Sequence, residues 1–155
     1  MVSFELDGPW RAMQLLDGFF DVQQDVGSPD VIALQFARPD RLYDAAGAVV
    51  SATTARAAAE AVADNVALDV LGESPSRIGG LHGFTVEVGN AGDRYVAVLK
   101  APTSALGIGP GRRMWISFFD TPDGLLAIMV GGSSEKWSEA LAIAEPVLES
   151  VRIGP

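Results

Sequence analysis

The glycine-rich stretch at residues 77–88, at the midpoint of the chain, constrains the fold more than any other part of the sequence. Gly79, Gly80 and Gly83 can adopt backbone angles that side chains disfavour, so they suit a sharp corner that leads into a strand. From residue 84 onward, apolar and polar side chains alternate with the period of a β-strand. We therefore predict a corner at which a helical segment ends and a run of strands begins.

The length and composition predict one packed domain. The 155 residues favour a single domain, 1–155, that buries about two-thirds of the surface of the unfolded chain. A hydrophobic fraction of 48% indicates a packed core rather than a disordered chain. No apolar run approaches the roughly 18 residues of a membrane span, and no basic and then apolar leader opens the sequence. We expect a soluble chain with no direct membrane insertion.

The charge and the missing cysteines exclude several classes of function. A formal net charge of −9 argues against nucleic acid as a partner, because phosphate binding is driven by Lys and Arg side chains that release counterions. The same acidity argues against an anionic membrane surface. The chain contains no cysteine, which excludes disulfides, thiolate catalysis and cysteine-based metal sites.

Hydrophobic periodicity and turn residues predict strands, a helix, more strands and a second helix. The first helix starts at Ala55, where Thr53 and Thr54 can cap it, and the second follows Gly132-Ser133-Ser134. The second helix carries an apolar stripe of Trp137, Leu141, Ala144, Leu148 and Val151. The expected strands are 2–6, 10–16, 19–24, 31–36, 81–88, 94–100, 112–119, 125–130 and 151–153.

This order of elements predicts the α+β class, with an antiparallel β-sheet of about six to eight strands flanked by two main helices. Residues 38–50 are predicted to form a loop with room for a short strand, and residues 102–111 a glycine-rich loop. The strand at 125–130 is apolar on both faces, so it should be covered on both sides.

Several segments, mainly in the second half, match a pattern found in one group of proteins. A short helix and a Leu-x-Val stretch precede a Gly-Gly-x-x-Gly corner and a strand, and the chain closes with a helix that ends in Val-Leu-x-Ser-Val. These segments are residues 58–63, 68–70, 78–84, 109–112, 123–128 and 137–151. Over residues 54–153 the chain resembles the Mog1/PsbP-like group, which includes extracytoplasmic domains and lipoproteins of actinobacteria.

The resemblance implies a layered sandwich of an antiparallel sheet and helices. It also implies an extracytoplasmic location and a module of a larger protein that is tethered by a lipid or a transmembrane helix. This chain has neither tether and no lipobox cysteine, so we expect an excised domain. The group has no shared catalytic residues to carry over, and the resemblance implies no cofactor.

His82, the only histidine, is the first candidate site residue. A zinc site needs three or four protein ligands, and His82 has no second histidine or cysteine to join it, so we predict no metal. A catalytic triad with Ser74, Ser76 or Ser117 would lack the Gly-x-Ser-x-Gly turn that exposes a nucleophile. His82 therefore stands as a ligand-binding candidate, or as a residue that caps a turn.

Residues 107–113 resemble a phosphate-binding loop. Such loops deliver the anion to a helix N-terminus, however, whereas this one leads into a strand, and Pro110 lacks a backbone donor. We predict a flexible loop that ends at a bulge. Because neighbours in a strand point to opposite faces, only one of Arg112 and Arg113 can bind an anionic ligand, and Arg113 is the candidate.

Aromatic residues provide the last candidates. Trp10, Trp115, Phe118 and Phe119 could line a small-molecule pocket between sheet and helix, although core packing explains them equally well. Trp10 and Trp115 complete the predicted ligand-binding set with His82 and Arg113.

The leading hypothesis is a non-catalytic domain that binds a small amphipathic molecule or a protein partner. The alternative is a small enzyme that acts on a hydrophobic substrate in an apolar pocket walled by Trp10 and Trp115. A third hypothesis is a structural or assembly module, for which an exposed apolar patch or a symmetric dimer would be the sign.

Overall fold

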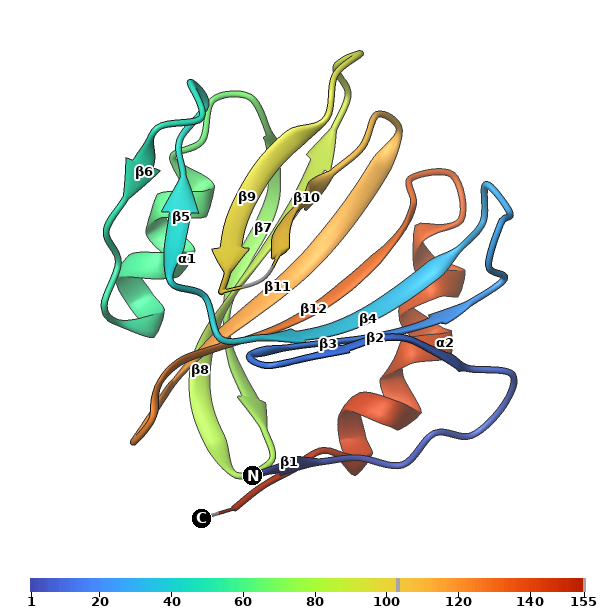
Figure 1. Cartoon of the computed structure of the whole chain (residues 1–155). Coiled ribbons are helices and arrows are strands. Elements are labelled where there is room, and N and C mark those ends of the chain that lie inside the picture. The colour runs from blue at the N-terminus through green and yellow to red at the C-terminus, as the bar shows by residue number, and fades with distance from the viewer. Residues whose placement is uncertain (103, 155) are drawn as a thin grey trace.

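The computed structural model describes residues 1–102 and 104–154 and is built around a seven-stranded antiparallel sheet (Figure 1). Its strands lie in the spatial order β2-β3-β4-β12-β11-β8-β7, so that β2 and β7 form the two edges. The strands span Arg11–Leu16 (β2), Phe19–Gln24 (β3), Ile32–Ala37 (β4), Gly124–Ser133 (β12), Arg112–Thr121 (β11), Leu81–Asn90 (β8) and Asp69–Ile78 (β7). The predicted α+β class and antiparallel sheet are confirmed.

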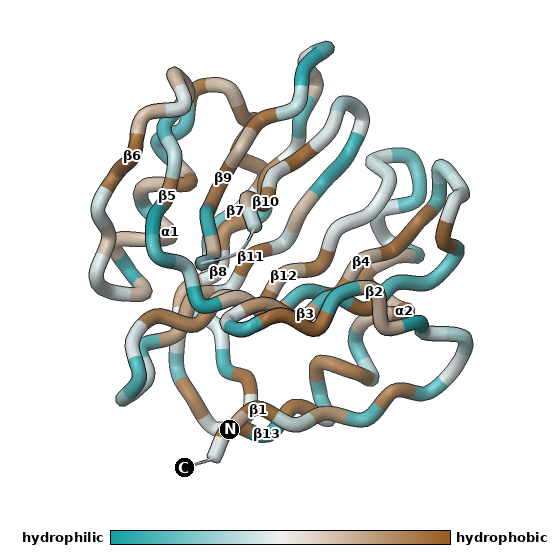
Figure 2. The backbone as a smooth tube through the Cα atoms, in the orientation of Figure 1, coloured by the Kyte–Doolittle hydropathy of each residue, from teal (hydrophilic) through white to brown (hydrophobic). Residues whose placement is uncertain are grey.

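The first face of this sheet is covered by helix α1 (Ala55–Ala63) and by a smaller four-stranded sheet. The order of the smaller sheet is β10-β9-β5-β6, with bounds Ser104–Ile108 (β10), Val96–Ala101 (β9), Arg41–Tyr43 (β5) and Val49–Val50 (β6). Helix α1 begins as predicted, because the Thr54 side chain accepts a hydrogen bond from the Ala57 N–H at 3.2 Å. Figure 2 shows hydrophobic stretches along β3 and β9, which belong to the two different sheets.

The second face is covered by helix α2 (Trp137–Ser150) and by a two-stranded ribbon of β1 (Val2–Ser3) and β13 (Arg152–Ile153). Helix α2 begins later than predicted, because Gly132 and Ser133 still belong to β12 and no side chain caps the helix. Its buried residues are Trp137, Ala140, Ala144 and Val147, whereas Leu141 and Leu148 are only partly buried. The apolar stripe is therefore rotated relative to the predicted one, although α2 still packs on the sheet.

The central strand β12 is buried on both faces, as its sequence predicted. Ala127 and Met129 belong to the core of the first face, and Leu126, Ile128 and Val130 belong to the core of the second. Two cores thus lie back to back across one sheet.

The glycine stretch has a different role from the predicted one. Gly79 and Gly80 have φ angles of 58° and 86° and form the turn between β7 and β8, two strands that pair along their whole length. The prediction of a corner between a helical segment and the strands was therefore wrong, because it missed β7. The segment Asp69–Ile78 shows no alternation of apolar and polar residues, since most of its side chains are exposed on both faces.

The segment 102–111 is less irregular than predicted. Strand β10 occupies Ser104–Ile108 and pairs with β9. The register shift lies between Leu106 and Gly107, before the predicted loop 107–113 and not at its end, where the bulge was expected. Residue 103, which falls in the predicted loop, and residue 155 of the predicted domain lie outside the described residues. In the described part of the chain no helix is long and apolar enough to cross a membrane.

Candidate functional site

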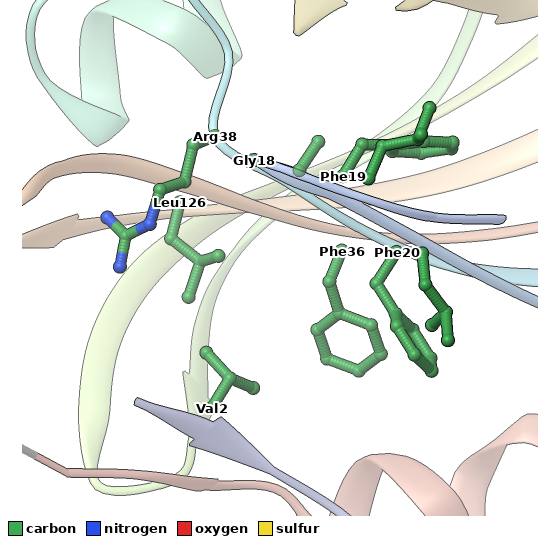
Figure 3. Close-up of a pocket in the computed structure, with 10 residues that line it drawn as sticks. Val2, Gly18, Phe19, Phe20, Phe36, Arg38 and Leu126 are labelled. Atoms are coloured by element: carbon green, nitrogen blue, oxygen red, sulfur yellow. The ribbon is translucent and has the colours of Figure 1, made fainter. Parts of the chain in front are cut away.

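An apolar hollow lies on the second face of the large sheet, where the β2–β3 turn, the end of β4 and the start of β12 meet β1 (Figure 3). Its volume is about 370 Å³, within the range of pockets that hold small molecules. We call it the Phe36 hollow. It is lined by Val2, Leu15, Leu16, Gly18, Phe19, Phe20, Phe36, Ala37, Arg38 and Leu126.

The strand register brings the aromatic wall of the hollow together. Phe20 of β3 is the cross-strand partner of Phe36 of β4, so both rings project from the same face of the sheet. Their centroids lie 6.2 Å apart in an edge-to-face arrangement, and Leu126 of β12 extends the wall on the same face. The wall is therefore a direct product of period-two alternation in three neighbouring strands.

The N-terminal segment forms the opposite wall. Phe4 stacks on Phe36 with centroids 4.7 Å apart, and Val2 faces the hollow from β1 (Figure 3). Few polar contacts hold this segment. The Met1 amino group donates to the Gly154 carbonyl at 2.6 Å, and the Glu5 N–H donates to the Ser150 hydroxyl at 2.8 Å. The hollow thus lies beside a ribbon of two-residue strands.

Arg38 supplies the only ionisable side chain among the described lining residues. Its Nη2 atom lies 3.5 Å from Asp123 Oδ2, and its Nη1 atom donates to Thr121 Oγ1 at 3.4 Å. Both are long contacts, and the Asp123 side chain is 74% exposed, so the ion pair is worth at most about 1 kcal/mol. The guanidinium can therefore turn to a carboxylate or phosphate ligand, whose geometry it matches in a bidentate manner.

A second hollow of about 500 Å³ adjoins the first and shares Val2 and Arg38 with it. Its other lining residues are Met1, Leu81, Thr121, Pro122, Asp123, Ile153 and Gly154. Arg38 thus lies between the two hollows, and the second has Thr121 and Asp123 in its lining as well.

The predicted site residues do not gather at these hollows. Arg113 and Trp115 lie two positions apart on one face of β11, where Arg113 Nη1 is 3.8 Å from Glu87 Oε1. Glu87 also accepts a hydrogen bond from the Trp137 indole at 2.8 Å. Trp115 packs against the second core. These two residues thus share one neighbourhood, next to Glu87.

Trp10 and His82 lie elsewhere. Trp10 precedes β2 and packs against the second core, and its indole nitrogen is buried with no hydrogen-bond partner among the described residues. His82 is exposed at the start of β8, opposite Arg77. Ser117 of β11, one of the serines considered for a triad, is buried and hydrogen-bonded to Thr85 of β8. Thr85 and His82 point to opposite faces of β8, so Ser117 lies away from His82.

A buried carboxylate lies on the other face of the sheet. Asp21 of β3 accepts a hydrogen bond from Gln23 at 2.8 Å through Oδ2, while its Oδ1 atom is buried without a partner among the described residues. Burial raises the pKa of Asp21, and hydrogen bonds from Gln23 and Gln35 only partly oppose this effect. Asp21 therefore holds its negative charge at a cost in stability.

Two solved structures resemble the whole chain. The crystal structure of LpqN, involved in cell envelope biogenesis of Mycobacterium tuberculosis, matches with a TM-score of 0.61 at 9% identity and covers 99% of this chain and 83% of LpqN. The solution structure of cyanobacterial PsbP (CyanoP) from Synechocystis sp. PCC 6803 matches with a TM-score of 0.54 at 10% identity, covering 99% and 86%. The chain has a Mog1/PsbP-like fold. No protein-family model and no curated protein sequence matches it.

Within this Mog1/PsbP-like fold, sequence reasoning missed the residues of the Phe36 hollow. The predicted strands 19–24 and 31–36 did place Phe20 and Phe36 on regular strands. It could not show that the covering layer would be thin at this point, because that depends on the pairing of β1 with β13 at the two ends of the chain. The sequence does place a cation, Arg38, directly after β4 and so at the end of the aromatic wall.

Proposed function

We propose that this chain is a non-catalytic binding domain that takes a small amphipathic molecule into the Phe36 hollow, with Arg38 holding an anionic head group. The observation that carries the proposal is the position of Arg38, which lines both the Phe36 hollow and the second hollow beside it. An apolar tail against Phe20, Phe36 and Leu126 would leave water, and burial of apolar surface contributes about 25 cal/mol per Å².

The lining supports binding rather than acid–base chemistry. General acid–base catalysis works best with a group whose pKa lies near the operating pH. The one ionisable group among the described lining residues of the Phe36 hollow is a guanidinium, which stays protonated in proteins. A guanidinium in this position can bind and orient an anion.

The fold supports an extracytoplasmic role within a larger protein. LpqN, which shares the fold, is involved in biogenesis of the cell envelope. A domain of this kind outside the cytoplasm would meet amphipathic molecules. A reporter fused to the natural full-length protein, active on only one side of the membrane, tests the location, and a signal from the cytoplasmic side contradicts it.

Two ligands with the same alkyl tail separate the apolar and ionic parts of the proposal. We expect decanoate to bind in isothermal titration calorimetry, and decyl maltoside, which lacks a charge, to bind more weakly. Arg38→Gln should weaken decanoate binding about tenfold, which corresponds to about 1.4 kcal/mol, and leave decyl maltoside unchanged. Arg94→Gln, at an exposed arginine before β9, is the matched control.

A second pair of variants locates the apolar part. Leu16→Glu places a carboxylate at the edge of the hollow and should abolish binding of decanoate. Leu71→Glu, on the opposite edge of the sheet, should leave the affinity unchanged. The two leucines are 44% and 45% exposed, so both variants should fold equally well. Equal affinities in Leu16→Glu and the wild-type protein contradict the assignment of the ligand to this hollow.

A further inference from the structure

Two hollows meet at one arginine. The Phe36 hollow and the second hollow have volumes of about 370 and 500 Å³ and share Val2 and Arg38. Each volume by itself lies within the range of pockets that hold small molecules. Figure 3 shows Arg38 at one end of the Phe36 hollow and Phe20 toward the other end. Arg38 therefore marks the junction between the two hollows.

The lining of the second hollow is mainly apolar. Leu81 of β8 and Ile153 of β13 line it and pack, partly buried, against the second core. Pro122, in the turn between β11 and β12, lines the same hollow and is exposed. Covering apolar surface of this kind removes it from water, which favours binding of an apolar group. The second hollow therefore suits another apolar group better than a polar one.

Arg38 is the only cationic side chain among the described residues that line either hollow. Its guanidinium donates to three oxygen atoms of the β11–β12 turn, Thr121 Oγ1, the Asp123 carbonyl and Asp123 Oδ2, at 3.4–3.5 Å. These contacts are long for hydrogen bonds, so a carboxylate or phosphate can replace them with shorter ones. An anionic group held by Arg38 would lie where the two hollows meet.

We infer that the ligand of this site is a two-armed amphiphilic anion, a carboxylate or phosphate that joins two apolar arms. One arm would lie in the Phe36 hollow, and the other would lie against Leu81 and Ile153 in the second hollow. The inference rests on the proposed function, because it needs the anionic group at Arg38. A linear amphiphile held there has one tail and can fill only one hollow. A linear chain that spans both hollows would place its head group away from Arg38.

Two pairs of ligands, each differing in the number of arms, test the inference. 2-Butyloctanoate and dodecanoate are isomers of the same charge, but only the first has its carboxylate between two arms. Dihexanoyl phosphatidic acid and dodecanoyl lysophosphatidic acid form the matching pair of phosphates. In calorimetric titrations below micelle formation, the two-armed member of at least one pair should bind about tenfold more tightly, because it covers apolar surface in both hollows.

The pattern of affinities separates this inference from the proposed function. The pair that shows the preference identifies the anionic group as a carboxylate or a phosphate. Equal affinities within both pairs, or tighter binding of the one-armed members, overturn the inference. Binding of decanoate then leaves the proposed function standing, whereas the absence of binding by every ligand overturns both.

A matched pair of proline variants locates the second arm. Pro122 lies in the turn after β11, and Pro110 lies in the turn before β11, outside the described lining of both hollows; both are exposed. Pro122→Glu places a carboxylate in the second hollow, so the ratio of affinities within the preferred pair should fall from about ten to about one. The added charge acts alike on both head groups at Arg38, so it cancels in this ratio.

Pro110→Glu adds the same charge at the other end of β11 and should leave the ratio at its wild-type value. Circular dichroism checks that both variants are folded. A ratio that Pro122→Glu leaves unchanged, or that both variants lower equally, overturns the assignment of the second arm to this hollow.

Discussion

Both faces of the seven-stranded sheet carry an apolar core, but the two cores are differently covered. On the first face, α1 and the four-stranded sheet close a core in which Ile116 and Phe118 are fully buried. On the second face, α2 covers the middle of the sheet, but near the β2–β3 turn the cover is a ribbon of two-residue strands. The Phe36 hollow lies under that ribbon.

The difference shows that the presence of a hollow depends on the layer that covers the sheet rather than on the residues of the sheet itself. Phe36 on the second face is nearly as buried as the residues of the first face. What differs is the cover: beside the Phe4 ring that stacks on Phe36, the thin ribbon leaves the Phe36 hollow open. Truncating a side chain should therefore lower the free energy of unfolding more on the first face than at the hollow on the second.

The largest expected effect separates a closed core from the wall of a hollow. Phe118→Ala removes a fully buried ring from the first face and should lower the free energy of unfolding by about 3–5 kcal/mol. Phe20→Ala, at the hollow on the second face, should lower it by less than about 2 kcal/mol, because Phe20 is partly exposed and its surroundings can rearrange. Equilibrium unfolding in urea measures both, and equal losses would contradict the comparison.

The next effect concerns how closely β8 approaches β11. A Cβ added at Gly83 would lie 2.1 Å from the carbonyl oxygen of Phe118, so Gly83→Ala should lower the free energy of unfolding by about 1–3 kcal/mol. Gly72→Ala on the edge strand β7 is the control, since a Cβ there meets nothing within 4 Å. Urea unfolding in which the two variants behave alike would show that the strands can separate without loss.

A smaller effect tests the helix that covers the second face. Leu141 of α2 is partly buried, so Leu141→Ala should lower the free energy of unfolding by about 1–2 kcal/mol, below the range of a fully buried leucine. Thermal unfolding should show the change as a lower midpoint. Ser138→Ala on the exposed side of α2 is the control. A loss above about 3 kcal/mol would mean that this face is packed as tightly as the first.

The smallest effect is a pH dependence on the first face. The pKa of Asp21 is raised in the folded state by burial, so the folded protein binds its proton more tightly than the unfolded chain does. This contribution to stability is present at low pH and is lost as the pH rises from the ordinary Asp pKa through the raised one.

Asp21→Asn removes this contribution, which stabilises the wild-type protein only at low pH. The free energy of unfolding of the variant, relative to that of the wild-type protein, should therefore be higher at pH 7 than at acidic pH, by up to about 1 kcal/mol. Urea unfolding at several pH values measures the difference. Asp69→Asn, at an exposed carboxylate, is the control. A difference that is constant from pH 3 to pH 7 would show that burial does not raise the pKa of Asp21.

Periodicity explains why much of this fold could be predicted from the sequence. The doubly apolar strand at 125–130 and the alternating strands at 19–24, 31–36 and 81–88 appear in the structure with small shifts. Strand β7 could not be predicted in this way, since an edge strand exposed on both faces has no period. The glycines beside it were taken for a corner, because φ > 0 suits both a corner and a hairpin turn.

The candidate site was harder to predict than the fold. Trp10, His82, Arg113 and Trp115 were chosen by residue type, and their role in ligand binding stays a prediction. The Phe36 hollow depends on where the first and last residues of the described chain meet, a contact between positions about as far apart in sequence as the chain allows. Local patterns carry no information about such a contact.

The meeting of the two ends also has a practical side. The amino group of Met1 and the carbonyl of Gly154 are 2.6 Å apart, and both residues line the second hollow. A short glycine linker could therefore join them, and the chain could be reopened at the exposed Val26-Gly27 turn as a circular permutant. An affinity tag at either end would sit at the mouth of that hollow, so ligand titrations call for untagged protein.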